Sequence, residues 1–194
     1  MERKSINVLL DLDNTLIYSI SVEKIKKKPW MKKFKIYEMN KDYIVFERPG
    51  LQKFLNWIFK HFNVSVWSAA TPDYVEFIAK NIIENDDRKL EYVLHSENCE
   101  DSQKYYGEES IKKLELLWDV HDIKGFGPDN TLIVDDLGKV YRANRENTLH
   151  IKKFVASEKS LEDKELEKIK SELKHIKKHF KEHINDIEGF RLIF

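Results

Sequence analysis

The sequence predicts an α/β fold with a Rossmann-like, mainly parallel sheet flanked by helices. Two aliphatic runs, residues 6–10 and 131–134, are each followed by two acidic residues, which is typical of buried parallel strands that bring polar groups to one edge of a sheet. Segments with apolar residues at helical spacing lie between and after these runs. The chain has 194 residues, 41% of them hydrophobic, so we expect a single domain over residues 1–194 with a buried core.

The other elements are predicted in chain order. Two extended runs flank a polar turn, which indicates a β-hairpin insertion over residues 34–47. Apolar residues at helical spacing predict a helix over residues 51–59, and a strand over 64–67 and a helix over 72–83 follow. The remaining expectations are a strand at 90–94, an exposed loop within 89–110, an edge strand at 148–151 and a C-terminal helix over 158–187. Because these elements fill the space between the acidic runs, we expect no large cap domain.

Four carboxylates lie at the predicted strand ends. Asp11 and Asp13 follow the first strand in an Asp-x-Asp-x-Thr pattern that ends at Thr15, and Asp135 and Asp136 follow the strand at 131–134. If the two strands are neighbours, these side chains form a pocket of hard oxygen ligands, suited to Mg²⁺ and a phosphoryl group.

These residues and Ser68 also have simpler structural interpretations. Ser68 follows the strand at 64–67, where its hydroxyl can hold a phosphate oxygen or cap a helix. Asp13 and Thr15 can be turn residues, and the acidic pair at 135–136 can end a strand. Strand-end position, residue type and order agree across the whole set, which favours a phosphoryl-transfer site.

At these motifs the chain resembles the haloacid-dehalogenase-like phosphatases. Within them it is similar to the branch of RNA polymerase C-terminal-domain phosphatases, called NLI-interacting-factor-like, and most of all to phosphatase domains that accompany a ubiquitin-like domain. The resemblance is carried by DLDNTL at 11–16, ERPGLQKFL at 47–55, VWSAATPDYVEFI at 66–78, IKKLELLW at 111–118 and IVDDLGKVYRANRENTLHIKKF at 133–154. It implies a haloacid-dehalogenase-like fold.

The resemblance also implies roles for single residues. Asp11 would be the nucleophile that forms an aspartyl-phosphate, and Asp13 would protonate the leaving alkoxide and then deprotonate water. Thr15 and Ser68 would position the nucleophile loop and bind phosphoryl oxygens. Mg²⁺ would be held by Asp11, the backbone carbonyl of Asp13, Asp135 and Asp136.

A phosphoryl-transfer site also needs a fixed positive charge, because carboxylates repel the charge on the transferring group. We expect this charge to come from Lys112, since Ile111-Lys112 with Leu114 and Trp118 resembles a stretch of the family. Lys113 is the competing candidate.

Charge and composition limit the partners. The 34 basic and 34 acidic residues give zero formal net charge, which argues against general nucleic-acid binding. No apolar run is long enough to cross a bilayer, and the single cysteine, Cys99, lies in a polar stretch. We therefore expect a soluble intracellular protein, cytoplasmic or nuclear, with no membrane partner and with a free surface thiol.

Seven lysines gather in residues 24–35, shortly after the first acidic motif. We call residues 24–35 the basic segment. It can flank the phosphate pocket and attract an acidic phosphopeptide, or it can be a solvated loop or a run that resembles a nuclear-localisation signal.

An uncapped pocket admits bulky partners, which favours a phosphorylated protein over a metabolite. The resemblance implies a Mg²⁺-dependent phosphoserine/phosphothreonine protein phosphatase acting through an aspartyl-phosphate. The alternatives are a phosphatase for nucleic-acid ends or small phosphate esters, and a non-catalytic phosphoprotein-binding module, which Asp13 argues against. The first strand begins almost at Met1, so we expect no ubiquitin-like domain before it.

Overall fold

The computed structural model describes residues 6–107 and 109–191, and only the course of the helix over residues 181–191. A five-stranded sheet forms its centre, in the order β6-β5-β1-β7-β8, with every neighbouring pair parallel. The strands are β1 (Asn7–Leu10), β5 (Asn63–Trp67), β6 (Val93–Leu94), β7 (Thr131–Asp135) and β8 (Thr148–His150). Because β1 pairs with both β5 and β7, the carboxyl ends of these three strands meet at one edge. The expected fold class is confirmed.

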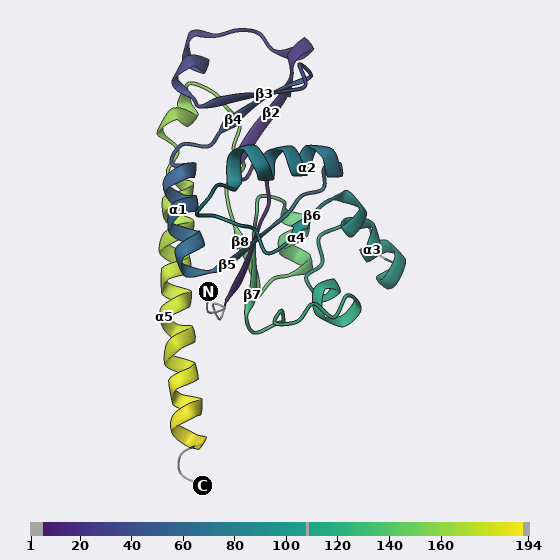
Figure 1. The fold of residues 1–194 in the computed structure, drawn as a ribbon, viewed down its shortest axis with the longest axis vertical. Coiled ribbons are helices and arrows are strands. Elements are labelled where there is room, and N and C mark those ends of the chain that lie inside the picture. The colour runs from purple at the N-terminus through teal and green to yellow at the C-terminus, as the bar shows by residue number, and fades with distance from the viewer. Residues whose placement is uncertain (1–5, 108, 192–194) are drawn as a thin grey trace.

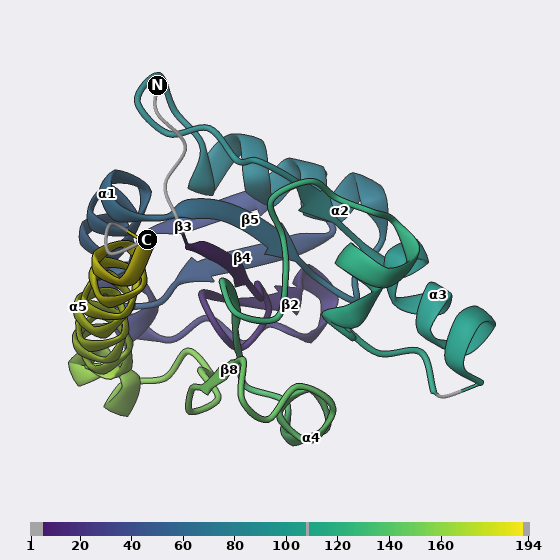
Figure 2. The same cartoon turned by 90° about the horizontal axis from the view of Figure 1, so that it is seen from below.

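Both faces of this sheet are covered, which explains why every residue of β1 and β5 is buried. On one face, Val8, Leu10 and Val66 pack with α1 (Leu51–His61), α2 (Pro72–Ile78) and α5 (Glu165–Arg191). On the other, Leu9 and Ile133 pack with α3 (Ser96–Tyr106), the segment 111–120 and α4 (Gly138–Ala143). Figures 1 and 2 show α1 and α5 lying side by side on their face of the sheet.

A second, antiparallel sheet lies at one end of the molecule, beyond α2 (Figure 1). It consists of β2 (Ile17–Ser21), β3 (Ile36–Met39) and β4 (Tyr43–Glu47) in the order β2-β4-β3. The predicted hairpin over residues 34–47 corresponds to β3 and β4, and β2 adds a third strand that the sequence did not indicate. Two 3₁₀ turns, Val22–Lys24 and Pro29–Lys33, connect β2 to β3 and carry much of the basic segment.

The structure corrects two expectations around residue 100. The stretch within 89–110 is not simply an exposed loop, because it contains α3, which ends at Gly107 with a left-handed φ of 66°. This helix buries only Cys99 and Ser102, so it has no apolar stripe that the sequence could reveal. The Cys99 side chain is 3% exposed and is therefore a buried thiol, not a surface one.

The C-terminal helix begins later than predicted, and the helix expected over 72–83 is not α-helical throughout. Residues 159–162 form a 3₁₀ turn, and α5 starts at Glu165, whose N–H donates to the Asp163 carboxylate at 3.0 Å. After α2, residues 79–83 continue as a π-helix. Within the ranges that the structure describes, no helix combines the length and the apolar character that crossing a membrane requires.

Candidate active site

The loop after β1 carries the first two predicted site residues. Asp11 continues the strand, and its N–H donates to the carbonyl of Val134 in β7 at 3.0 Å. The chain then turns sharply, because the N–H groups of residues 15–17 all donate to the carbonyl of Leu12, at 2.8 to 3.2 Å. Asn14 takes a left-handed φ of 64° within this turn. We call residues 11–17, which contain the predicted nucleophile Asp11, the nucleophile loop.

Lys112 is the lysine that reaches the carboxylates. Its side chain is buried, and its Nζ contacts Oδ1 of Asp11 and, at 2.7 Å, Oδ2 of Asp135. The Nζ of Lys113 lies 4.1 Å above the ring of Tyr106 instead. Burial alone lowers the pKa of Lys112, but the charges of Asp11 and Asp135 outweigh burial and raise that pKa above its ordinary value. The Lys112 ammonium is therefore a fixed positive charge inside the site.

Three carboxylates beside this lysine fit a divalent cation. One oxygen each from Asp11, Asp135 and Asp136 lies within 4.8 Å of the other two. Among the described residues, Oδ2 of Asp11 is buried without a hydrogen-bond partner. Burial raises the pKa of Asp135 and of Asp136, and the Asp11 charge raises both further. Because Lys112 balances only one of these negative charges, a hard cation such as Mg²⁺ fits the remaining oxygens.

Asp13 points to a different partner. Its Oδ1 accepts a hydrogen bond of 2.6 Å from the Tyr74 hydroxyl on α2, which also contacts the Ser19 hydroxyl on β2. Burial raises the pKa of Asp13, and the Asp11 charge adds to this effect, while the Tyr74 hydrogen bond acts in the opposite direction; the net pKa is raised. A hollow of about 540 Å³ opens beside Asp13 and is lined by Ser19, Tyr43 and Tyr74 among others. Asp13 is therefore placed where it can hold a proton next to a bound group.

The two predicted phosphate-binding hydroxyls lie on either side of this cluster. Thr15 is fully buried, with its Oγ1 3.5 Å from Oδ1 of Asp136, at the limit of a hydrogen bond. Ser68 follows β5, and its Oγ accepts from the N–H of Ala70 at 3.1 Å. The hydroxyl proton of Ser68 is thus left to donate. The N-cap of α2 is Thr71, so Ser68 does not cap that helix.

Three residues that support the site were not singled out from the sequence. Tyr74 is one of them. Asn144, at the end of α4, donates to the carbonyl of Lys112 at 2.8 Å and accepts from the N–H of Leu114 at 2.8 Å, which fixes the segment bearing the lysine. Arg48 is buried and donates to the carbonyl of Thr15 at 2.8 Å. None has a chemical signal of its own, although all three lie in the stretches that carry the family resemblance.

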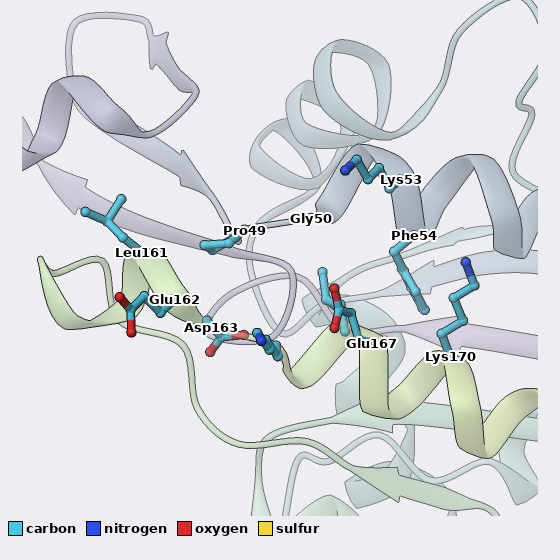
Figure 3. Close-up of a pocket in the computed structure, with 11 residues that line it drawn as sticks. Pro49, Gly50, Lys53, Phe54, Leu161, Glu162, Asp163, Glu167 and Lys170 are labelled. Atoms are coloured by element: carbon cyan, nitrogen blue, oxygen red, sulfur yellow. The ribbon is translucent and has the colours of Figure 1, made fainter.

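A separate hollow of about 330 Å³ lies between the start of α1 and the start of α5 (Figure 3). Its lining includes Pro49, Phe54, Asp163 and Lys170, and none of the predicted site residues. Asp163 is paired there with Arg48 at 2.9 Å. This hollow is therefore distinct from the carboxylate cluster.

A parallel sheet that brings acidic residues from β1 and β7 against a buried lysine fits the haloacid-dehalogenase-type phosphatases, a class of phosphoric monoester hydrolases. Within that class, residues 6–185 match the model of the NLI interacting factor-like phosphatases. The chain belongs to this family, which confirms the resemblance inferred from its motifs.

Individual relatives support this family assignment. A putative CTD phosphatase-like protein of Invertebrate iridescent virus 6 is 38% identical over 175 residues, which cover 86% of this chain and 96% of the viral protein. The ubiquitin-like domain-containing CTD phosphatase 1 of Danio rerio is 28% identical over 135 residues, which are 68% of this chain and 42% of that protein. The structure of the fission yeast RNA polymerase II CTD phosphatase Fcp1 bound to beryllium fluoride superposes with a TM-score of 0.70 at 17% identity. It covers 96% of this chain, which spans 66% of the Fcp1 chain, and supports the fold.

Proposed function

We propose that this protein is a Mg²⁺-dependent phosphoserine/phosphothreonine protein phosphatase that acts through an aspartyl-phosphate. One observation carries the proposal. Asp11 has one oxygen against the Lys112 ammonium and the other buried without a partner among the described residues, beside Asp135 and Asp136. A carboxylate held in this way suits nucleophilic attack on a phosphoryl group whose charge Lys112 and a cation neutralise.

In the first half-reaction an oxygen of Asp11 attacks phosphorus, and the bond from phosphorus to the seryl or threonyl oxygen breaks. Asp13 gives its proton to that leaving oxygen, for which its raised pKa suits it. In the second half-reaction Asp13 takes a proton from water, which attacks phosphorus and releases phosphate from Asp11. Lys112, Thr15 and Ser68 bind the phosphoryl oxygens throughout.

The metal ligands in this proposal are Asp11, the backbone carbonyl of Asp13, Asp135 and Asp136. When bound, Mg²⁺ supplies positive charge against the phosphoryl oxygens and so lowers their repulsion from the nucleophile. The contribution of the chain is to hold these carboxylates together against their mutual repulsion, with Lys112 as a resident counter-charge.

The hollow beside Asp13 supports a protein substrate. It is open and is bordered by the three-stranded sheet and α2 rather than by a cap domain, so an extended chain can enter. Several relatives are named as CTD phosphatases, which supports a phosphorylated protein segment as the substrate class.

The test is a panel of phosphoserine and phosphothreonine peptides, 5′-phosphorylated oligonucleotides and sugar phosphates, assayed with Mg²⁺. We expect the highest kcat/KM with the peptides and none in the Asp11→Asn variant, because a neutral amide cannot attack phosphorus. A preference for oligonucleotides or sugar phosphates would replace the proposed substrate class. Turnover in Asp11→Asn would remove the proposed nucleophile, and a folded wild type that binds phosphopeptides without hydrolysing any would indicate a binding module.

A further inference from the structure

A third hollow, of about 350 Å³, lies between the basic segment and the three-stranded sheet. We call it the lysine-rimmed hollow. Its apolar lining consists of Val22, Ile25, Met31, Ile36 and Ile44. Val22 and Ile36 remain 39% and 37% exposed, so the hollow keeps apolar surface in contact with water. Such surface, when concave and surrounded by polar groups, is typical of a binding site.

Four lysines surround this apolar lining: Lys27, Lys28, Lys32 and Lys41. Glu38 is the single acidic residue among its lining residues. Within the described part of the chain, none of the four ammonium groups forms a salt bridge. The rim therefore carries unbalanced positive charge, and a complementary ligand is acidic around an apolar centre.

The backbone of Lys41 gives independent support. Asn40 and Lys41 form the tip of the β3–β4 hairpin with left-handed φ values of 49° and 65°. Glycine adopts this conformation without strain, whereas lysine does not. Lys41 lines the hollow in spite of this backbone strain, which suggests a role for its side chain in binding rather than in folding.

We propose that the lysine-rimmed hollow docks an acidic segment of the protein substrate, in which one apolar side chain is flanked by carboxylates. This inference rests on the proposed function and adds a recognition site remote from the phosphate. A protein segment is favoured over a membrane surface because the apolar side chains line a concavity instead of projecting from a flat face.

The lysine-rimmed hollow and the hollow beside Asp13 lie on opposite faces of the three-stranded sheet. Tyr43 lines the hollow beside Asp13, and the next residue, Ile44, lines the lysine-rimmed hollow. At the hairpin tip, Asn40 lines the hollow beside Asp13 and Lys41 lines the lysine-rimmed hollow. A substrate chain that passes this tip connects the two sites. Since a sheet is about 10 Å thick and an extended chain advances about 3.3 Å per residue, crossing this thickness takes about three residues. Passing around the hairpin tip lengthens the path, so the spacer needs at least about four residues.

The first experiment measures binding without turnover. The probe is a fluorescein-labelled, unphosphorylated peptide with one leucine flanked by glutamates, followed by fluorescence anisotropy. We expect the double variant Lys27→Gln/Lys28→Gln to weaken binding by about 3- to 20-fold at low salt, in line with two partly exposed ion pairs. The matched control is Lys24→Gln/Lys26→Gln, which removes the same charge from the same segment outside the hollow and should change binding less than about twofold.

Two further variants separate binding from folding. Lys41→Gly should weaken peptide binding while preserving or raising the melting temperature, because glycine relieves the left-handed strain. Ile36→Asp should weaken binding as well, because it places a carboxylate in the apolar lining. Equal losses in the two double variants would show that general charge, not this hollow, attracts the peptide, and would overturn the proposal.

The second experiment joins the docking segment to a phosphoserine through spacers of one to ten residues. KM should fall once the spacer reaches about four residues, and this gain should vanish in Lys27→Gln/Lys28→Gln. Aryl phosphate hydrolysis should stay unchanged in that variant, since neither lysine belongs to the catalytic site. An inactive enzyme that still binds the peptide would refute the proposed function but not the docking site. Binding to phosphatidylserine vesicles but not to the peptide would assign the hollow to lipid and overturn the docking proposal.

Discussion

Replacing Arg48 should destabilise both the fold and the nucleophile loop. The guanidinium is buried and makes four hydrogen bonds: two to the Asp163 carboxylate at 2.9 Å, one to the carbonyl of Thr15 and one to the carbonyl of Lys152, both at 2.8 Å. It therefore joins the nucleophile loop, the segment after β8 and the start of α5. The Arg48→Met variant fills similar volume but removes the guanidinium from all of these acceptors, although the Asp163 carboxylate keeps the N–H of Glu165.

The expected loss follows from these contacts. Removing one partner of a buried ion pair costs about 3–5 kcal/mol, because the other charge stays behind without compensation. The Asp163 side chain is 15% exposed, so water recovers part of its solvation, while the two orphaned carbonyls add about 1 kcal/mol each. We expect the free energy of unfolding to fall by about 3–5 kcal/mol, a large part of the stability of a typical domain.

Urea unfolding followed by the fluorescence of the four tryptophans measures this loss. Lys35→Met is the control, because Lys35 is 57% exposed in its 3.2 Å pair with Glu47 and should cost less than about 1 kcal/mol. The double variant Arg48→Met/Asp163→Leu should recover part of the lost free energy of unfolding, because it also removes the uncompensated charge of Asp163. A decrease below about 1 kcal/mol in Arg48→Met would refute the reasoning that this contact network joins the three segments.

The other predictions concern chemistry. Asp13→Asn should slow turnover of a phosphoserine peptide by about 10²- to 10⁴-fold and that of an aryl phosphate less, since aryl leaving groups need less protonation; equal losses would argue against the acid role. Burial raises the pKa of Asp13, so kcat for the peptide should fall as pH rises through that raised pKa, where the acid loses its proton. A pH dependence of kcat identical to that of Asp13→Asn would contradict this. Lys112→Ala should lose most activity and Lys113→Ala little, and the reverse result would show that Lys113, not Lys112, is the lysine that the site needs. EDTA should inactivate the enzyme and Mg²⁺ restore it, whereas larger Ca²⁺ should bind without supporting turnover; full activity in EDTA would remove the metal assignment.

Residues that signal chemistry by type and strand-end position could be located from the sequence. Asp11, Asp135 and Asp136 follow apolar strands, and parallel pairing of β1 with β7 brings them together as expected. The choice of Lys112 over Lys113 depended on family resemblance, because adjacent lysines look alike in a sequence. Their side chains separate only when Asn144 fixes the segment that bears them.

Other features depend on tertiary contacts that leave little trace in the sequence. Tyr74 is a buried residue of α2, and only the tertiary fold brings its hydroxyl to Asp13 and to Ser19 on β2. The helix α3 was missed because Cys99 and Ser102 are its buried residues, too few to give an apolar period. The start of α5 was misplaced because residues 159–162 form a separate 3₁₀ turn, which ends at Asp163 in extended backbone and looks helical in the sequence.

The nucleophile loop is held by a residue that lies far from it in the sequence. Asn14 donates its side-chain amide to the carbonyl of Phe154 at 3.0 Å, and its own carbonyl accepts from the N–H of Phe154 at 2.6 Å, across 140 positions of sequence. During synthesis, Asn14 leaves the ribosome 140 residues before Phe154. Until Phe154 emerges, the loop lacks both of these hydrogen bonds, so its final conformation can form only after most of the domain has been made.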